Sequence, residues 1–385
     1  MEIMGQCDPA FRFVREEFAR NFAERGEVGA SVCVLVAGKP VVDLWGGAAD
    51  RFTARPWQRD TLGVVWSCTK GAVALCAHLL AHEGKLDLDA SVSRYWPEFA
   101  AAGKADIPVR WLLTHQSGVA AIRAPLPPGS AYDWDFVVGK LAAEEPFWEP
   151  GTRQGYHAAT FGHLVGELVR RVSGQSLSDF FREKIALPYG LDFHLGLPEV
   201  DEPRVAPTIR PDPLPSGAKP WRFLTRIGTE GSIQTLTVRN RGRAPGDTDS
   251  RQAHAACLPS EGGITNARGL AGLYAAIPEL LPASIVEEIG DTHSASAVDA
   301  TLLLGMRFGL GFMKSSDNRR GPEGARDSLL LGRRALGHAG MGGSLGFLDP
   351  QREMAFGYAM SKQGHGVLLN ERGQALADAA YAALG

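Results

Sequence analysis

The sequence predicts an α+β fold in which both ends of the chain build one antiparallel sheet and a mainly helical lobe is inserted between them. Strand-like apolar runs occur near residues 29–46 and again from about 301 to 360, while helical periodicity dominates from 71 to about 190. Pairing the two strand regions in one sheet is the economical arrangement, with helices on the sheet and a cleft against the helical lobe. The predicted domains are 1–75 together with 300–385, an α/β sandwich, and 76–299, mainly helical with long cleft loops.

The individual elements follow from local patterns. Phenylalanines recur at helical spacing over 8–25, and the runs 29–37 and 39–46, joined by Gly38-Lys39, predict a β-hairpin. Further helices are predicted from 71 onward and over 108–115, 135–144, 158–173, 177–185 and 267–277. Strands are predicted at 308–313, 335–338, 343–349 and 354–360, before a last helix over 366–384. Segment 198–260, rich in Pro, Gly, Arg and Asp, is predicted to form long excursions that shape a pocket.

Composition excludes several classes of partner and cofactor. A net charge of −3 offers no basic surplus for nucleic acid or an anionic membrane surface. The chain has no apolar stretch of membrane-spanning length and no secretory pattern at its start, so a cytoplasmic location is expected. Five irregularly spaced cysteines argue against a disulfide framework, and the lack of Cys-x-x-Cys argues against structural zinc. We expect neither a metal nor another cofactor, and the oligomeric state stays open.

A serine and a lysine stand three residues apart where an apolar run meets the first long helical pattern. Ser67 and Lys70 would lie on one face of a helix start, about one turn apart, so the lysine amine can reach the serine hydroxyl. The helix N-terminus adds backbone N–H groups and a positive dipole end. This arrangement can activate a serine without a Ser-His-Asp triad. A solvated helix cap is the alternative interpretation of the bare pattern.

Two further segments carry candidate groups. Tyr156 lies at a predicted loop-to-helix junction, where a hydroxyl can point into a cleft and a nearby lysine ammonium would favour the ionised form, as suits a general base. The glycine-rich segment 337–343 follows a predicted strand, and its backbone could approach a ligand closely. An N–H group there could form an oxyanion hole with the N–H of Ser67. A packed tyrosine and a plain hairpin turn are the alternatives.

A second serine motif competes with Ser67. Residues 342–346 read Gly-Gly-Ser-Leu-Gly and fit the G-x-S-x-G nucleophile elbow, which would make Ser344 the nucleophile. That elbow needs a helix after the serine, whereas the residues after Ser344 read as a strand and a turn. We therefore favour Ser67.

The three segments together resemble a known set of motifs. Ser67-Cys-Thr-Lys70, Tyr156-His-Ala158 and His338-Ala-Gly340 are similar, in order and spacing, to the S-x-x-K, Y-x-N and K-T-G elements of serine β-lactamases and penicillin-binding proteins. The resemblance is closer to the β-lactamase-like carboxylesterases of family VIII, in which H-x-G commonly replaces K-T-G. It covers most of the chain and implies a β-lactamase/transpeptidase-like fold.

The resemblance also implies acyl transfer through a covalent acyl-serine. Ser67 would be the nucleophile, and Lys70 and Tyr156 would activate it and pass its proton to the leaving group; which of the two is the formal base stays open. The N–H groups of Ser67 and Met341 would form the oxyanion hole, with a slip of one residue possible at the neighbouring glycines. His338 and Gly340 would contact the substrate.

Two departures from the family pattern bear on specificity. Ala158 replaces an asparagine that could bind a substrate acylamino group, and His338 replaces a lysine that supplies a fixed cation for a substrate carboxylate. Both changes favour small or medium neutral esters over β-lactams, and Trp148 could line the acyl pocket. The alternatives are an amide-directed relative (a β-lactamase, D-aminopeptidase or oligoamide hydrolase), an acyltransferase, and a non-catalytic scaffold that keeps the fold.

Overall fold

The computed structural model describes residues 2–214, 216–244 and 246–385, so residues 215 and 245 of the predicted excursion 198–260, and residue 1, lie outside the described residues. Its main sheet runs β1-β3-β2-β12-β11-β10, and all the pairs are antiparallel. These strands are β1 (Ile3–Cys7), β2 (Gly29–Val36), β3 (Lys39–Asp50), β10 (Leu336–Ala339), β11 (Leu345–Asp349) and β12 (Met354–Met360), and β4 (Arg55–Pro56) pairs with β3. Because β12 lies beside β2, the two chain ends share one sheet, which confirms the predicted α+β fold.

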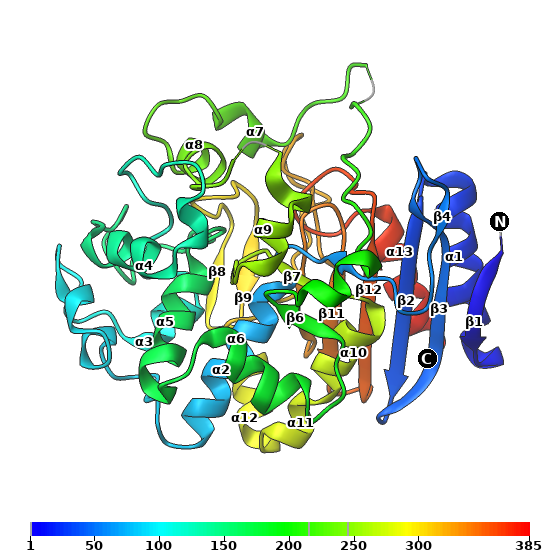
Figure 1. The fold of residues 1–385 in the computed structure, drawn as a ribbon, viewed down its shortest axis with the longest axis horizontal. Coiled ribbons are helices and arrows are strands. Elements are labelled where there is room, and N and C mark those ends of the chain that lie inside the picture. Colours follow the sequence, from blue (N-terminus) through cyan, green and yellow to red (C-terminus); the bar gives the residue numbers. More distant parts are fainter. Residues whose placement is uncertain (1, 215, 245) are drawn as a thin grey trace.

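Alternation along the strands gives the sheet two apolar faces. Val32 and Val34 of β2 pack with α1 (Arg12–Glu24) and α13 (Glu371–Ala382), whereas Cys33 packs with α10 (Ala267–Ala275). Gly357 of β12 allows α10 to approach closely, because a Cβ there would lie 2.1 Å from the Ala267 carbonyl oxygen. The sheet therefore stands between α10 on one side and α1 with α13 on the other (Figure 1).

The helical middle is packed around α2 (Thr69–His82). Every residue from Thr69 to Leu80 is buried, and α2 contacts α5 and α6 on one side and β10 on the other. A helix that is apolar on all sides belongs in a core, and here it links the helical lobe to the sheet. The other helices of this region are α3 (Val109–Leu113), α4 (Trp134–Ala143), α5 (Phe161–Ser173), α6 (Leu177–Phe181), α11 (Ile277–Leu280) and α12 (Ala283–Gly290).

A small sheet supports the start of α2. It has the order β5-β7-β6, from β5 (Gly63–Val64), β6 (Phe193–Leu195) and β7 (Gly263–Thr265). A separate pair joins β8 (Ser294–Ser296) and β9 (Met306–Phe308). Helix α10 lies within the predicted helical domain 76–299, yet it packs on the main sheet. The predicted domain limits therefore stay a prediction.

The structure differs from the sequence-based expectations at a few elements. β1 was not predicted, because its residues are mostly exposed and lack apolar alternation; it is held by backbone pairing to β3. The strand expected over 308–313 ends at Phe308, since Gly311 takes a positive φ of 86° and turns the chain. The described residues of segment 198–260 contain three short α-helices, α7 (Arg222–Arg226), α8 (Ile233–Arg239) and α9 (Arg251–Ala255).

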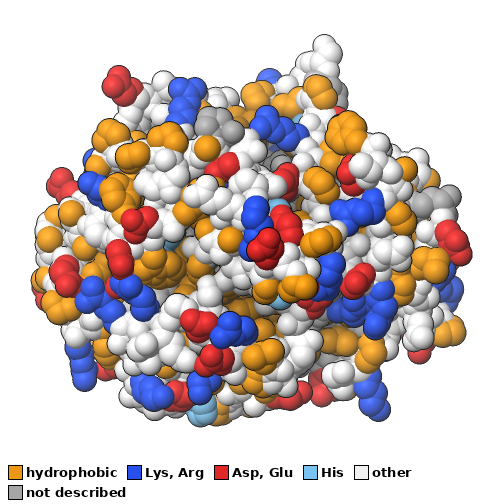
Figure 2. Space-filling model, viewed as in Figure 1, with side chains coloured by type: hydrophobic (Ala, Val, Ile, Leu, Met, Phe, Trp, Pro, Cys, Tyr) orange, Lys and Arg blue, Asp and Glu red, His pale blue; other side chains and the backbone are white. Residues whose placement is uncertain are grey.

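The surface carries both signs of charge. Acidic and basic side chains are interspersed over the face in Figure 2, in keeping with 40 Lys and Arg against 43 Asp and Glu. None of the helices in the described residues is long and apolar enough to cross a membrane. All five cysteines have free thiols. The cytoplasmic location stays a prediction.

Candidate active site

Ser67 lies in the turn that joins β5 to α2. The Val65 N–H donates to the Gly263 carbonyl of β7 (2.9 Å), and the Gly263 N–H donates to the Thr69 hydroxyl (2.8 Å), so both sides of the turn are anchored to β7. Trp66 has a φ of 50°, a left-handed conformation that is costly for a bulky residue. The turn thus presents the half-exposed Ser67 side chain at the N-terminal end of a buried helix.

Lys70 is fully buried in the first turn of α2 and faces Ser67. Its Nζ lies 3.1 Å from Ser67 Oγ and donates to the carbonyl oxygens of Ala158 and Ser260, each at 2.8 Å. An ammonium could donate to all three oxygens, whereas a neutral amine that donates to the two carbonyls would keep its lone pair for the Ser67 O–H. Burial, followed by the positive charge of Arg241, holds the pKa of Lys70 well below its usual value of 10.5. Burial thus favours the neutral amine, and the geometry places that amine where it can accept the serine proton.

Tyr156 completes the group from the loop before α5. Its ring centroid lies 4.9 Å from Lys70 Nζ, and its hydroxyl is buried without a well-formed hydrogen bond to any described residue. Burial raises the pKa of Tyr156 above its usual value of 10, and the interaction with Ser67 offsets only part of that rise. This direction is opposite to the expected ionised tyrosine, because burial of the hydroxyl disfavours the charged form. A neutral Tyr156 is suited to relay a proton rather than to act as a tyrosinate base.

Asp299 is a supporting residue that the sequence did not reveal. Its buried carboxylate accepts from the Tyr156 N–H (2.9 and 3.0 Å) and from the N–H groups of Thr301 (2.9 Å) and Leu302 (2.8 Å). Gln154 adds a side-chain bond at 3.2 Å. Asp299 therefore fixes the backbone on which Tyr156 stands. The separation of 143 residues hides this contact from pattern reading, although an aspartate followed by Ala-Thr-Leu is a local turn signal.

His338 lies on β10, facing the same site as Tyr156. The two ring centroids are 6.0 Å apart, and His338 Nδ1 bonds to the Ala339 carbonyl oxygen at 2.8 Å. Nδ1 is therefore the protonated nitrogen, and Nε2 is a buried acceptor without a partner among the described residues. Burial, followed by the Lys70 charge, lowers the pKa of His338 to about 3. His338 consequently supplies no cation at neutral pH.

The glycine-rich turn after β10 packs directly on the Ser67 segment. A Cβ on Gly340 would lie 2.3 Å from the Val65 carbonyl oxygen, and the Cys68 thiol lies 3.1 Å from the His338 carbonyl oxygen. Met341 packs with the apolar cluster that contains Trp66. Neither the Ser67 N–H nor the Met341 N–H donates to another described residue. Two free donors on adjoining turns are what an oxyanion hole requires.

Trp148 lies behind the Tyr156 loop. Its ring is 5.9 Å from the His157 ring at 90°, and a Cβ on Gly155 would lie 2.5 Å from the Trp148 ring. These contacts place the indole against the residues on both sides of Tyr156. Its role as a wall of the acyl pocket stays a prediction.

The competing serine, Ser344, is part of the packing. It precedes β11 rather than a helix, is 1 % exposed, and donates its hydroxyl to the Val65 carbonyl at 3.0 Å. Its hydroxyl therefore braces the Ser67 turn, and among the described residues the only side chain that bonds to it is the Cys68 thiol at 3.7 Å. The described geometry argues against a nucleophile elbow.

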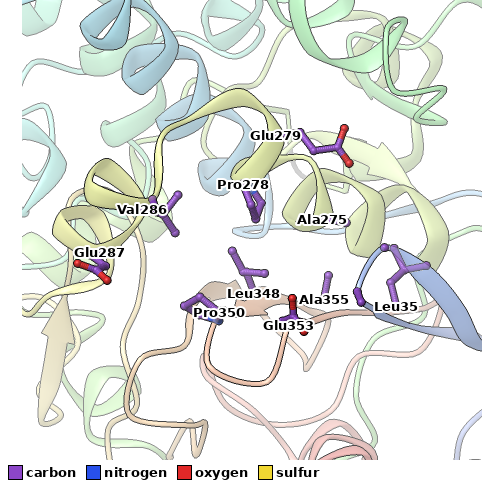
Figure 3. A pocket seen from close by; sticks show the side chains of 13 residues that line it. Leu35, Ala275, Pro278, Glu279, Val286, Glu287, Leu348, Pro350, Glu353 and Ala355 are labelled. Atoms are coloured by element: carbon purple, nitrogen blue, oxygen red, sulfur yellow. The ribbon is translucent and has the colours of Figure 1, made fainter.

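A cavity of about 520 Å³ lies elsewhere, between β2, β11 and β12 and the helices α10 to α12 (Figure 3). Leu348 from the sheet and Val286 from α12 are among its apolar lining residues, and Glu279, Glu287 and Glu353 also line it. None of the residues that line it belongs to the Ser67 cluster. This cavity is therefore separate from the candidate active site.

Comparisons with known proteins agree with this geometry. The model of the Beta-lactamase family matches residues 15–381. The esterase/beta-lactamase LipL of Mycobacterium tuberculosis (strain ATCC 25618 / H37Rv) is 33 % identical over 370 residues, which cover 92 % of this chain and 82 % of LipL. The crystal structure of a family VIII carboxylesterase is 36 % identical, with a TM-score of 0.86 and full coverage of both chains. A penicillin-binding protein homologue from Caulobacter crescentus is 34 % identical, with a TM-score of 0.87 and full coverage of both chains.

The family match spans most of the chain, and these relatives align over at least four-fifths of their own length. Together with a serine and a lysine amine in contact at a helix start, they fix the assignment. This chain belongs to the beta-lactamase family and is an enzyme of the serine hydrolase class.

Proposed function

We propose that the protein is a carboxylesterase that cleaves small to medium neutral esters through an acyl-Ser67 intermediate. The observation that carries the proposal is the contact of 3.1 Å between Lys70 Nζ and Ser67 Oγ, made by an amine whose two other bonds go to carbonyl oxygens. Burial lowers the pKa of this amine and so favours its neutral form, which is the form that can act as a general base.

Acylation uses each group of the site once. Lys70 accepts the Ser67 proton as Oγ attacks the ester carbonyl carbon, and the carbonyl oxygen takes the negative charge. The free N–H groups of Ser67 and Met341 stabilise that oxyanion. The proton then passes from Lys70 by way of the Tyr156 hydroxyl to the departing alkoxide, which leaves as an alcohol. The acyl group stays on Ser67.

Deacylation repeats these steps with water. Lys70, neutral again, accepts a proton from the attacking water while the same two N–H groups stabilise the second oxyanion. Collapse of the tetrahedral intermediate releases the carboxylic acid, and the proton returns to Ser67 Oγ. The cycle requires groups of this chain and water alone.

The lining of the site supports neutral esters over substrates that carry an acylamino group or a carboxylate. Ala158 offers its carbonyl to Lys70 and has no side-chain amide for an acylamino group. His338 is neutral and offers an acceptor nitrogen, which repels a substrate carboxylate instead of attracting it. A small neutral ester carries no charge, so its binding here does not bury an ion without a partner.

A labelling and substrate experiment tests the proposal. A fluorophosphonate should modify Ser67, and Ser67→Ala should abolish hydrolysis of p-nitrophenyl butyrate, whose turnover should exceed that of nitrocefin and of a D-alanyl amide. Faster turnover of nitrocefin or the amide would place the enzyme with the amide-directed relatives. A folded protein that is neither labelled at Ser67 nor active on any of the three would instead be a non-catalytic scaffold.

A further inference from the structure

The turn that carries the Met341 N–H joins β10 to β11, and the Gly340 N–H donates to the Ser344 carbonyl at its base (2.8 Å). It is a β-turn closed by the Gly343 N–H on the Gly340 carbonyl (2.9 Å), and Gly342 has a φ of 87°, as the third residue of a type II turn does. Glycine flanks Met341 on both sides, so backbone torsions near it have weak local preferences. The hairpin holds the two ends of the turn, so the direction of the Met341 N–H depends also on contacts from outside the turn.

Those contacts come from the segment between β12 and α13. Asn370 Nδ2 donates to the Gly342 carbonyl at 2.6 Å, and the Gly364 N–H donates to the same oxygen at 2.8 Å. Gln363 Nε2 adds a longer bond of 3.4 Å to the Met341 carbonyl. Both carbonyls in the middle of the turn are thus bound by residues 363–370.

Asn370 is the side chain around which this contact is built. A Cβ on Gly343 would lie 2.1 Å from Asn370 Nδ2, and a Cβ on Gly364 would lie 2.3 Å from it. The other end of the amide is equally occupied, because Asn370 Oδ1 accepts the Gly373 N–H (3.3 Å) as the N-cap of α13. One side chain therefore joins the start of a core helix to the turn beside Ser67.

We infer that Asn370 is a positioning residue that aims the Met341 N–H into the oxyanion hole. Its amide fixes the Gly342 carbonyl, and through it the turn, relative to the rigid start of α13. The inference rests on the proposed function, since it needs an oxyanion at Ser67. It assigns Asn370 no contact with substrate.

The chemistry of the amide allows its two roles to be separated. Asn370→Asp keeps an oxygen for the helix cap, where aspartate is as good as asparagine, but it places a second oxygen against the Gly342 carbonyl oxygen. The turn must then move away. Asn370→Ser also caps the helix but is too short to reach Gly342, which gives a second, uncharged variant.

The matched control is Asn266, the N-cap of α10. Its Oδ1 accepts the Gly269 N–H at 3.0 Å, and its Nδ2 has no partner among the described residues. Asn266→Asp therefore makes the same change at a helix start without breaking a contact to a turn. This control distinguishes the loss of the Asn370 hydrogen bond to Gly342 from the general effect of placing a new carboxylate at a helix N-terminus.

The test measures kcat and KM on p-nitrophenyl butyrate, the rate of fluorophosphonate labelling at Ser67, and the thermal midpoint. For Asn370→Asp and Asn370→Ser we expect kcat and the labelling rate to fall about tenfold to a hundredfold, with KM within about threefold. Asn266→Asp should keep kcat within about threefold. Folded Asn370 variants with kcat within threefold of the parent would overturn the inference, as would an equal loss in Asn266→Asp. Failure of the proposed function is a different result, because the parent protein would then lack Ser67 labelling and esterase activity.

Discussion

Asp299→Asn should damage both the stability of the fold and the position of Tyr156. The amide can keep one oxygen on the Tyr156, Thr301 and Leu302 N–H groups, but its NH₂ then faces the Gln154 amide and removes the second contact of the Tyr156 N–H, and the bonds that remain lose their charged acceptor. A buried N–H left without an acceptor costs about 1–3 kcal/mol, and bonds to a charged group contribute about 1.5–3 kcal/mol. We expect a loss of about 3 kcal/mol, which lowers the thermal midpoint of a chain of 385 residues by about 4 °C.

The effect on catalysis should be larger than the effect on stability suggests. A displacement of about 1 Å of a reacting group can cost about a hundredfold, so kcat should fall by about tenfold to a hundredfold while KM changes little. Asp349→Asn is the matched control: this buried carboxylate accepts the Gln351 N–H and the Tyr381 O–H at the far end of β11. The control should lose stability and keep kcat. If Asp299→Asn keeps normal kcat, or if Asp349→Asn loses as much, Asp299 does not act through Tyr156.

Three further outcomes are expected. The kcat/KM for a neutral ester should fall tenfold per pH unit below the depressed pKa of Lys70, because the ammonium cannot accept a proton. Arg241→Gln removes a positive neighbour of Lys70, so it should move this acid limb of the pH–rate profile to higher pH. An acid limb at an unchanged pH would contradict the role of Lys70 as the base. Ser344→Ala should keep kcat within about threefold while lowering stability by about 1–2 kcal/mol, since the Val65 carbonyl loses its hydroxyl partner; loss of activity in a folded variant would restore Ser344 as a nucleophile. Ala158→Asn should raise the ratio of nitrocefin to ester turnover, as measured on one preparation of each protein, and an unchanged ratio would remove residue 158 from substrate selection.

Elements with strong periodicity were predictable from the sequence. The hairpin of β2 and β3, the strand β12 and the helices α2 and α5 follow the apolar spacing because each buries a full face or, for α2, all faces. β1 has no such signal, since an edge strand can be held by backbone pairing while its side chains stay exposed. The start of α13 at Glu371 instead of 366 is set by the Asn370 cap.

The residues of the candidate site also fall into those that the sequence could reveal and those that it could not. Ser67 and Lys70 were visible because their chemistry is local to one helix turn. Tyr156 and the glycine-rich segment 337–343 were weaker candidates from local pattern alone, and the resemblance to known motifs gave them their expected roles. The residues that orient these groups were not visible, because their partners are distant in sequence: Asp299 lies 143 residues from Tyr156, and Asn370 lies 28 residues from Gly342. A short polar side chain in a loop has no periodicity, and its importance comes only from the donor or acceptor that the fold brings to it.

The charge balance of the site explains how the groups act together. Before substrate binds, Lys70, Tyr156 and His338 are all held toward their neutral forms by burial. Transfer of the Ser67 proton to Lys70 therefore creates a cation at the same moment as the attack creates an oxyanion, and the pair exists only along the reaction path. Interactions that arise in the transition state and are absent from the ground state are those that raise kcat. A permanently charged lysine in place of His338 would stabilise an anionic substrate before the reaction as well as during it, and a neutral imidazole removes that ground-state attraction.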